Sequence, residues 1–281
     1  MKKIFVISRI IFPIFIIGTI IYLFYAQPFG HKPIKFNNQI TEIENFIKSG
    51  VKVIFINPVD GTSSKLIKVL KKAHQMGIKI IVVDSQLKNS NNYVNCTIRS
   101  NNYQAGVLCA KELMARQKSA NILVLQQPTA ISVVERIKGF EDTIKRHPSF
   151  QIIDRINTTG QSENSYPKVR RYLSEGKNFD TIMSLNDKTA VGALAAINSI
   201  NSNKEIAIYS IDGSENIKKM LSNKNPNIKA TVAQSPLQIG KVAVNVAYKL
   251  LNHQKVKKEI ILPVQLITSK NIKDFNITGW Q

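Results

Sequence analysis

The sequence has few cysteines, few acidic side chains, and little of the glycine and proline that mark fibrous or disordered chains. Two cysteines in 281 residues exclude a small disulfide-stapled scaffold, and 13 Gly with 10 Pro exclude a collagen-like or low-complexity chain. The 43% of hydrophobic residues is enough to build a core. These counts predict a folded protein made of one large α/β domain or two smaller lobes.

Acidic residues number only 18 against 39 Lys and Arg, which gives a net charge of +21. Such a charge would suit a polyanion, because cations that neutralise phosphates release counterions. The basic residues are mostly Lys, however, and they are spread along the chain instead of forming one stripe. We therefore predict no nucleic-acid partner.

Residues 10–26 contain no charged side chain and would form a helix about 25 Å long, at the low end of what spans a bilayer. They form either a signal-peptide core or a membrane anchor. Only Ala26 offers a small residue for cleavage, so we favour an uncleaved anchor within residues 1–30. The basic residues ahead of the run place the N-terminus in the cytoplasm and the rest of the chain outside it; they are Lys2, Lys3 and Arg9.

After residue 38, short runs rich in Val and Ile alternate with stretches of helical spacing. The runs begin roughly every 25 to 30 residues, which is the size of a βαβ unit. This pattern predicts parallel sheets covered on both faces by helices. The predicted strands are residues 51–56, 78–83, 122–125, 152–156, 181–185, 206–211 and 228–233.

Polar side chains follow five of these strands. In open α/β sheets, ligands bind beyond the carboxyl ends of the strands, so these side chains are predicted to share one crevice with Arg136. Carboxylate, amide and guanidinium groups together suit a neutral, polyhydroxylated ligand. The alternative is that they cap helices and form turns. The five residues are Asn57, Asp84, Asn186, Asp212 and Gln234.

Seven stretches, in order, resemble the type I periplasmic binding proteins, specifically the ribose-like sugar-binding proteins of ABC transport systems. The resemblance implies two Rossmann-like lobes, joined by three crossovers, that close on a sugar. It also implies ligand contacts from Asn57, Asp84, Arg136, Asn186, Asp212 and Gln234. The matching stretches are residues 39–60, 77–85, 100–106, 135–140, 185–194, 210–213 and 232–240.

The resemblance also implies how the chain is divided into lobes. Lobe one takes residues 37–100 and 237–262, lobe two takes 101–236, and residues 263–281 form a crossover and tail. Family members begin with a strand, a helix and a second strand before the segment that matches Gln39, and this unit is missing here. The first lobe is therefore expected to be truncated, with the strand at 51–56 at its edge.

We predict a membrane-anchored, extracytoplasmic solute-binding protein for a sugar or small polyol. Its partner would be the permease of an ABC transporter or a membrane sensor kinase. Two alternatives stay open: an exported sensor or scaffold subunit completed by a partner chain, and a degenerate remnant without ligand affinity.

An enzyme is not expected. Asp84 and Asp212 could be imagined as a glycosidase pair, but such a pair needs one protonated acid at a defined separation. The sequence has no Gly-x-Ser-x-Gly elbow and no Walker loop, and its 4 His lie far apart, so neither a cofactor nor a metal is predicted. Cys96 and Cys109 are predicted to be two buried free thiols instead of a disulfide.

Overall fold

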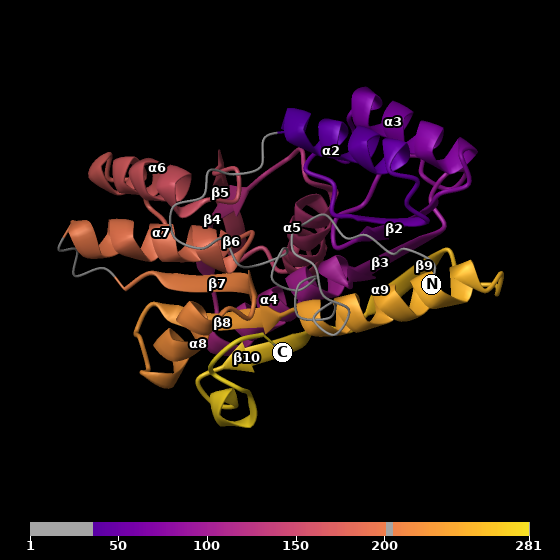
Figure 1. Ribbon diagram of the computed structural model, residues 1–281. Helices are drawn as coiled ribbons and strands as arrows, with labels where there is room; N and C mark the ends of the chain where they lie inside the picture. The colour runs from indigo at the N-terminus through magenta and orange to yellow at the C-terminus, as the bar shows by residue number, and fades with distance from the viewer. Residues whose placement is uncertain (1–35, 201–204, 281) are drawn as a thin grey trace. The chain divides into compact units, whose positions relative to one another are not determined.

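The computed structural model describes residues 36–200 and 205–280, with side chains from residue 39 onward (Figure 1). The chain divides into two compact units. Of the described residues, the first unit comprises 36–100, Thr129–Ile131 and Pro236–Leu262, and the second comprises Asn101–Pro128, 132–200, 205–235 and 263–280.

The predicted anchor at residues 10–26 lies outside the described residues. Within the part of the chain that the structure describes, no helix has both the length and the apolar character needed to cross a bilayer.

The first unit is built on a parallel four-stranded sheet in the order β1-β2-β3-β9. Its strands are β1 (Val53–Ile56), β2 (Lys79–Val83), β3 (Cys96–Ser100) and β9 (Glu259–Leu262). In the described part of the chain, β1 therefore lies at one end of the sheet.

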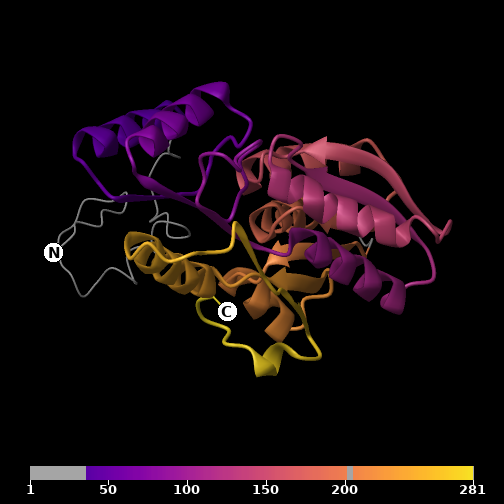
Figure 2. The same cartoon turned by 90° about the vertical axis from the view of Figure 1, so that its right-hand side faces the viewer.

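Helices cover both faces of this sheet. Two of them, α2 (Phe36–Lys48) and α3 (Ser64–Gln75), lie side by side, as the indigo and purple ribbons of Figure 2 show. Ile54 and Ile56 pack with them, whereas Val53 and Phe55 face the opposite way and pack with α9 (Pro236–Leu251). The alternation of β1 side chains between two apolar layers explains why the strand is a continuous hydrophobic run.

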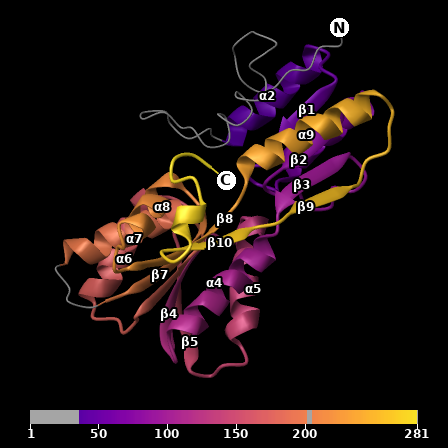
Figure 3. The ribbon, with the colours of Figure 1, turned by 90° about the horizontal axis from the view of Figure 1, so that it is seen from below.

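The second unit is built on a six-stranded sheet in the order β10-β8-β7-β6-β4-β5. Helices α6, α7 and α8 share one apolar cluster with strand residues such as Leu123 and Ile208. Helix α4 packs against β7, β8 and β10, and α5 lies beside α4 (Figure 3). The strands are β4 (Ala120–Gln126), β5 (Phe150–Asn157), β6 (Thr181–Ser184), β7 (Ala207–Asp212), β8 (Ile228–Ala233) and β10 (Gln265–Thr268). The helices are α4 (Asn102–Arg116), α5 (Ile131–Ile144), α6 (Ser162–Ser174), α7 (Asp187–Ser199) and α8 (Glu215–Ser222), followed near the C-terminus by the short 3-10 helix η1 (Ile272–Asp274).

All seven predicted strands are present, and the α/β class is confirmed. The predicted parallel sheets are also present, with one exception in a strand that was not predicted: β10 pairs antiparallel with β8, Gln265 lying opposite Ala233. An antiparallel strand at the edge of an otherwise parallel sheet is common, and nothing in a four-residue apolar pattern specifies its direction. Residues 263–281, predicted as a crossover and tail, thus add a strand to the second unit.

Candidate functional site

Asn57 and Asp84 come together in the first unit because each directly follows one of two neighbouring parallel strands. Asn57 follows β1 and Asp84 follows β2. The Asn57 Nδ2 donates to Asp84 Oδ2 at 3.0 Å, and the backbone N–H of Ser85 donates to Asn57 Oδ1 at 3.3 Å. Asp84 adopts a left-handed backbone with φ of 65°, which is uncommon for a residue with a side chain. The backbone therefore holds an amide and a carboxylate in one fixed arrangement.

Arg136 is the central charged group of the second unit, and it is only 5% exposed. It comes from α5, and its side chain contacts three other segments of the chain. Its Nε donates to Asn102 Oδ1 at 2.9 Å, and its Nη1 donates to the carbonyl oxygen of Leu185 at 2.9 Å. The same Nη1 lies 3.5 Å from Asp212 Oδ1, within ion-pair distance. A buried guanidinium held at three points is rigid, which is what directional recognition requires.

Asp212 and Gln234 lie at the carboxyl ends of β7 and β8. With Asn102 and Arg136 they form the polar set of the second unit. The Gln234 Nε2 donates to Asp212 Oδ1 at 2.7 Å, and the Gln234 backbone N–H donates to the Asp212 carbonyl oxygen at 3.1 Å. Asp212 has a φ of 142°, so the chain turns sharply where the carboxylate is presented.

Two buried polar atoms of this set have no hydrogen-bond partner in the described part of the chain. They are Gln234 Oε1 and Asn102 Nδ2, on side chains 3% and 1% exposed. A buried polar atom without a partner costs about 1–3 kcal/mol. Gln234 Oε1 is an acceptor and Asn102 Nδ2 is a donor, and each is of a type that pairs with a hydroxyl group.

Asn186 is used differently. It is the N-cap of α7: its Oδ1 accepts from the Thr189 backbone N–H at 2.9 Å, and its Nδ2 donates to the Gly160 carbonyl oxygen at 3.1 Å. The capping alternative therefore applies to this residue. Asn102, by contrast, orients Arg136 and was not among the predicted site residues. The signal that could have found it is its place in the stretch 100–106, at the start of a helix.

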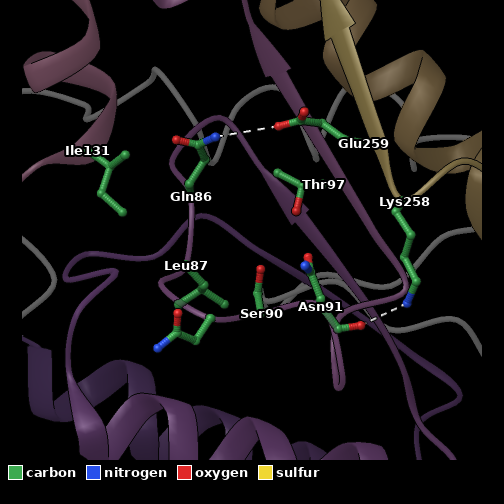
Figure 4. Close-up of a pocket in the computed structure, with 9 residues that line it drawn as sticks. Gln86, Leu87, Ser90, Asn91, Thr97, Ile131, Lys258 and Glu259 are labelled. Atoms are coloured by element: carbon green, nitrogen blue, oxygen red, sulfur yellow. Dashed lines mark hydrogen bonds between the residues drawn. The ribbon is translucent and has the colours of Figure 1, made fainter.

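The first unit also contains a polar pocket of about 370 Å³, shown in Figure 4. Its charged groups already interact with the chain. Glu259 Oε1 accepts from Arg99 Nε at 2.7 Å and from Gln86 Nε2 at 3.5 Å, and Lys258 Nζ donates to the Asn91 carbonyl oxygen at 3.0 Å. None of the six predicted site residues lines it. The lining residues are Gln86, Leu87, Asn89, Ser90, Asn91, Thr97, Ile131, Lys258 and Glu259.

Both cysteines are free and buried, as predicted. Burial raises the pKa of the Cys96 thiol to about 11 and raises the pKa of Cys109 further. Because the thiolate is the reactive form, neither is suited to redox or nucleophilic chemistry at neutral pH. Among the residues that the structure describes, no group of three or more His, Cys, Asp and Glu is placed to hold a metal ion.

Two α/β units, each presenting polar side chains at the carboxyl ends of its parallel strands, define a class of ligand-binding proteins. The chain belongs to the periplasmic binding protein domain family, whose model matches residues 33–255. The predicted family is thereby confirmed.

Curated relatives and solved structures support this assignment. The chain is 28% identical over 236 residues to the ribose import binding protein of Bacillus subtilis. This match covers 83% of this chain and 74% of that protein. It is 29% identical over 247 residues to the galactofuranose-binding protein of Escherichia coli, covering 84% and 74%. It also resembles an ABC transporter solute-binding protein from Agrobacterium vitis with bound D-fucose, with a TM-score of 0.77, 27% identity, and coverage of 84% and 81%.

Proposed function

We propose that the protein binds a neutral sugar or similar small polyol outside the cytoplasm and delivers it to the permease of an ABC transporter. The observation that carries this proposal is the buried set in the second unit. There the rigid guanidinium from α5 lies beside a carboxylate at the end of β7, which in turn bonds Gln234, the residue after the adjacent strand β8 whose Oε1 is unsatisfied. Such a set offers directional donors and acceptors to hydroxyl groups without one dominant charge.

The relatives support the ligand class and the partner. Their names refer to ribose, galactofuranose and D-fucose, and to import or ABC transport. This favours a permease over a sensor kinase as the partner. We further infer that binding is not followed by catalysis. Asp212 accepts from Gln234 and faces Arg136, surroundings that suit a hydrogen-bond acceptor better than the protonated acid of a glycosidase.

Calorimetry with D-ribose, L-arabinose, D-galactose and D-fucose tests the ligand. We expect heat from at least one of these sugars, and we expect Asp212→Asn to weaken its binding about 10- to 100-fold, because a charged hydrogen-bond acceptor contributes about 1.5–3 kcal/mol. The control is Asp142→Asn in the same unit, an exposed carboxylate that pairs with Lys138 at 2.6 Å. No heat from any of the four sugars with folded wild-type protein would remove the proposal.

We also propose that residues 10–26 anchor the protein in the membrane, with the two units on the outer side. The expected result is that wild-type protein stays in the membrane pellet after an alkaline carbonate wash. Ile17→Lys should release it, because a Lys at the centre of a span costs about 2.5–3.5 kcal/mol. Thr19→Ser, in the same run, should change nothing. Wild-type protein in the soluble fraction would contradict the anchor.

A further inference from the structure

We propose that Asp187 is the positioning residue of the second unit, because its single buried carboxylate ties together the three strand ends that carry Asn186, Asp212 and Gln234. The inference rests on the proposed function only in taking the positioned residues to bind a sugar. The hydrogen bonds that Asp187 accepts are a feature of the fold itself.

Asp187 receives hydrogen bonds from two different strand ends. At β7, Ser210 Oγ donates to Asp187 Oδ1, and just beyond that strand the Ser214 backbone N–H donates to Oδ2 at 2.7 Å. At β8, Thr231 Oγ1 donates to Oδ1 at 2.8 Å. Thr231 Oγ1 in turn accepts from the Gly213 backbone N–H at 3.1 Å, so the turn after Asp212 is held from two directions.

Each bonded residue lies close in sequence to a member of the candidate site. Asp187 directly follows Asn186, Ser210 and Ser214 flank Asp212 two residues away on either side, and Thr231 precedes Gln234 by three residues. A shift of Asp187 would therefore displace both Asp212 and Gln234, whose side chains bond to each other at 2.7 Å.

The surroundings of Asp187 make this arrangement costly to keep. The side chain is 1% exposed, and no cation of the described residues lies within ion-pair distance of it. Burial raises the pKa of Asp187, while the bonds from Ser210, Ser214 and Thr231 oppose that rise. Two titratable groups are close enough to be affected by its charge: Asp187 adds to the rise that burial causes in the pKa of Cys109, and it opposes the fall that burial causes in the pKa of Lys218. If one of these donors moved away, a buried charge would be left without a hydrogen bond, which is costly. The donors are therefore held in the arrangement in which they converge on the carboxylate.

The decisive variant is Thr231→Val, which removes the hydroxyl from a fully buried side chain and keeps its shape. Its matched control is Thr181→Val in the same sheet. Thr181 is the first residue of β6 and so lies at the amino end of its strand, whereas the candidate site is at the carboxyl ends. Thr181 is also fully buried and bonds Gln117 Oε1 at 3.2 Å and Asp180 Oδ1 at 2.8 Å. Ser210→Ala is a milder second variant that touches Asp187 but not Gly213.

Two quantities are measured on the full-length protein. The first is calorimetric affinity for whichever of the four sugars named above gives the largest heat with wild-type protein. The second is the exchange rate of the Gln234 backbone amide, which donates to Asp212 and makes no bond to Thr231 or Asp187. Both threonine variants should lower the melting temperature. Only Thr231→Val should weaken affinity at least tenfold and speed Gln234 exchange at least tenfold, and Ser210→Ala should shift both in the same direction. Thr231→Ser should restore both.

The positioning role is overturned if Thr231→Val stays within twofold of wild type in both measurements, or if Thr181→Val changes them as much. If wild-type protein gives no heat with any of the four sugars, the proposed function fails, and Gln234 exchange decides the positioning role alone. Unchanged exchange in Thr231→Val and Ser210→Ala would then overturn it too.

Discussion

Arg136→Met is expected to lower the free energy of unfolding of the second unit by about 3–5 kcal/mol, because it removes the donors of two acceptors, each of which costs about 1–3 kcal/mol when buried and unpaired, and the cation beside the partly buried Asp212. The substitution leaves Asp212 without its cation and removes the donors that serve Asn102 Oδ1 and the Leu185 carbonyl oxygen. Methionine replaces much of the aliphatic stem, so the loss reflects the polar contacts more than a cavity.

Trp280 makes this measurement specific. It is the only tryptophan of the sequence, and it belongs to the second unit, so its fluorescence during urea unfolding reports on that unit. The control is Arg171→Met, which removes a guanidinium that pairs with Glu175 at 2.6 Å but has a side chain 76% exposed. An exposed pair of this kind contributes about 1 kcal/mol or less. Equal unfolding midpoints for the two variants would contradict the structural role given to Arg136.

Arg136→Lys separates charge from geometry. Lysine keeps the cation but cannot place two donors on different acceptors as the guanidinium does toward Asn102 and Leu185. We expect it to recover part of the stability and little of the sugar affinity.

Periodicity was sufficient to predict seven of the ten strands in the described part of the chain, and the polar residues that follow five of them. It missed β3, β9 and β10. Val53 to Ile56 and Ile80 to Val83 are continuous apolar runs because both faces of a parallel sheet are covered, and Asn57 and Asp84 then lie together because neighbouring parallel strands end at the same edge. The contact between Asn57 and Asp84 is a consequence of that rule alone.

Contacts that depend on tertiary structure were not predictable in this way. Asn102 starts a helix, and nothing local indicates that an arginine 34 residues later reaches its Oδ1. Asp187 lies shortly after a predicted strand and resembles an ordinary residue of a helix start, yet it bonds side chains 23 and 44 residues away. Asn186 satisfied the strand-end rule and is nonetheless a cap, since a residue after a strand is often also the residue before a helix.

Gly106→Ala is expected to destabilise the second unit by about 3 kcal/mol, although alanine in a helix normally stabilises by about 1 kcal/mol relative to glycine. Helices α4 and α5 approach each other through two glycines. A Cβ on Gly106 would lie 1.8 Å from the Arg136 carbonyl oxygen and 2.6 Å from the Phe140 backbone nitrogen. Reciprocally, a Cβ on Gly139 would lie 2.0 Å from the Tyr103 carbonyl oxygen. These are backbone atoms, which cannot rotate away as a flexible side chain would.

The matched control is Gly176→Ala in the same unit. Gly176 has a φ of 67° and open space around it, so alanine there meets only backbone strain, about 1–2 kcal/mol. Unfolding followed by Trp280 fluorescence should rank Gly106→Ala as the less stable variant. Because α5 carries Arg136, the same substitution should also weaken sugar binding, whereas Gly176→Ala should not. A Gly106→Ala protein as stable as wild type would mean that the α4–α5 contact yields easily, and a rigid Arg136 could then not be the basis of recognition in this unit.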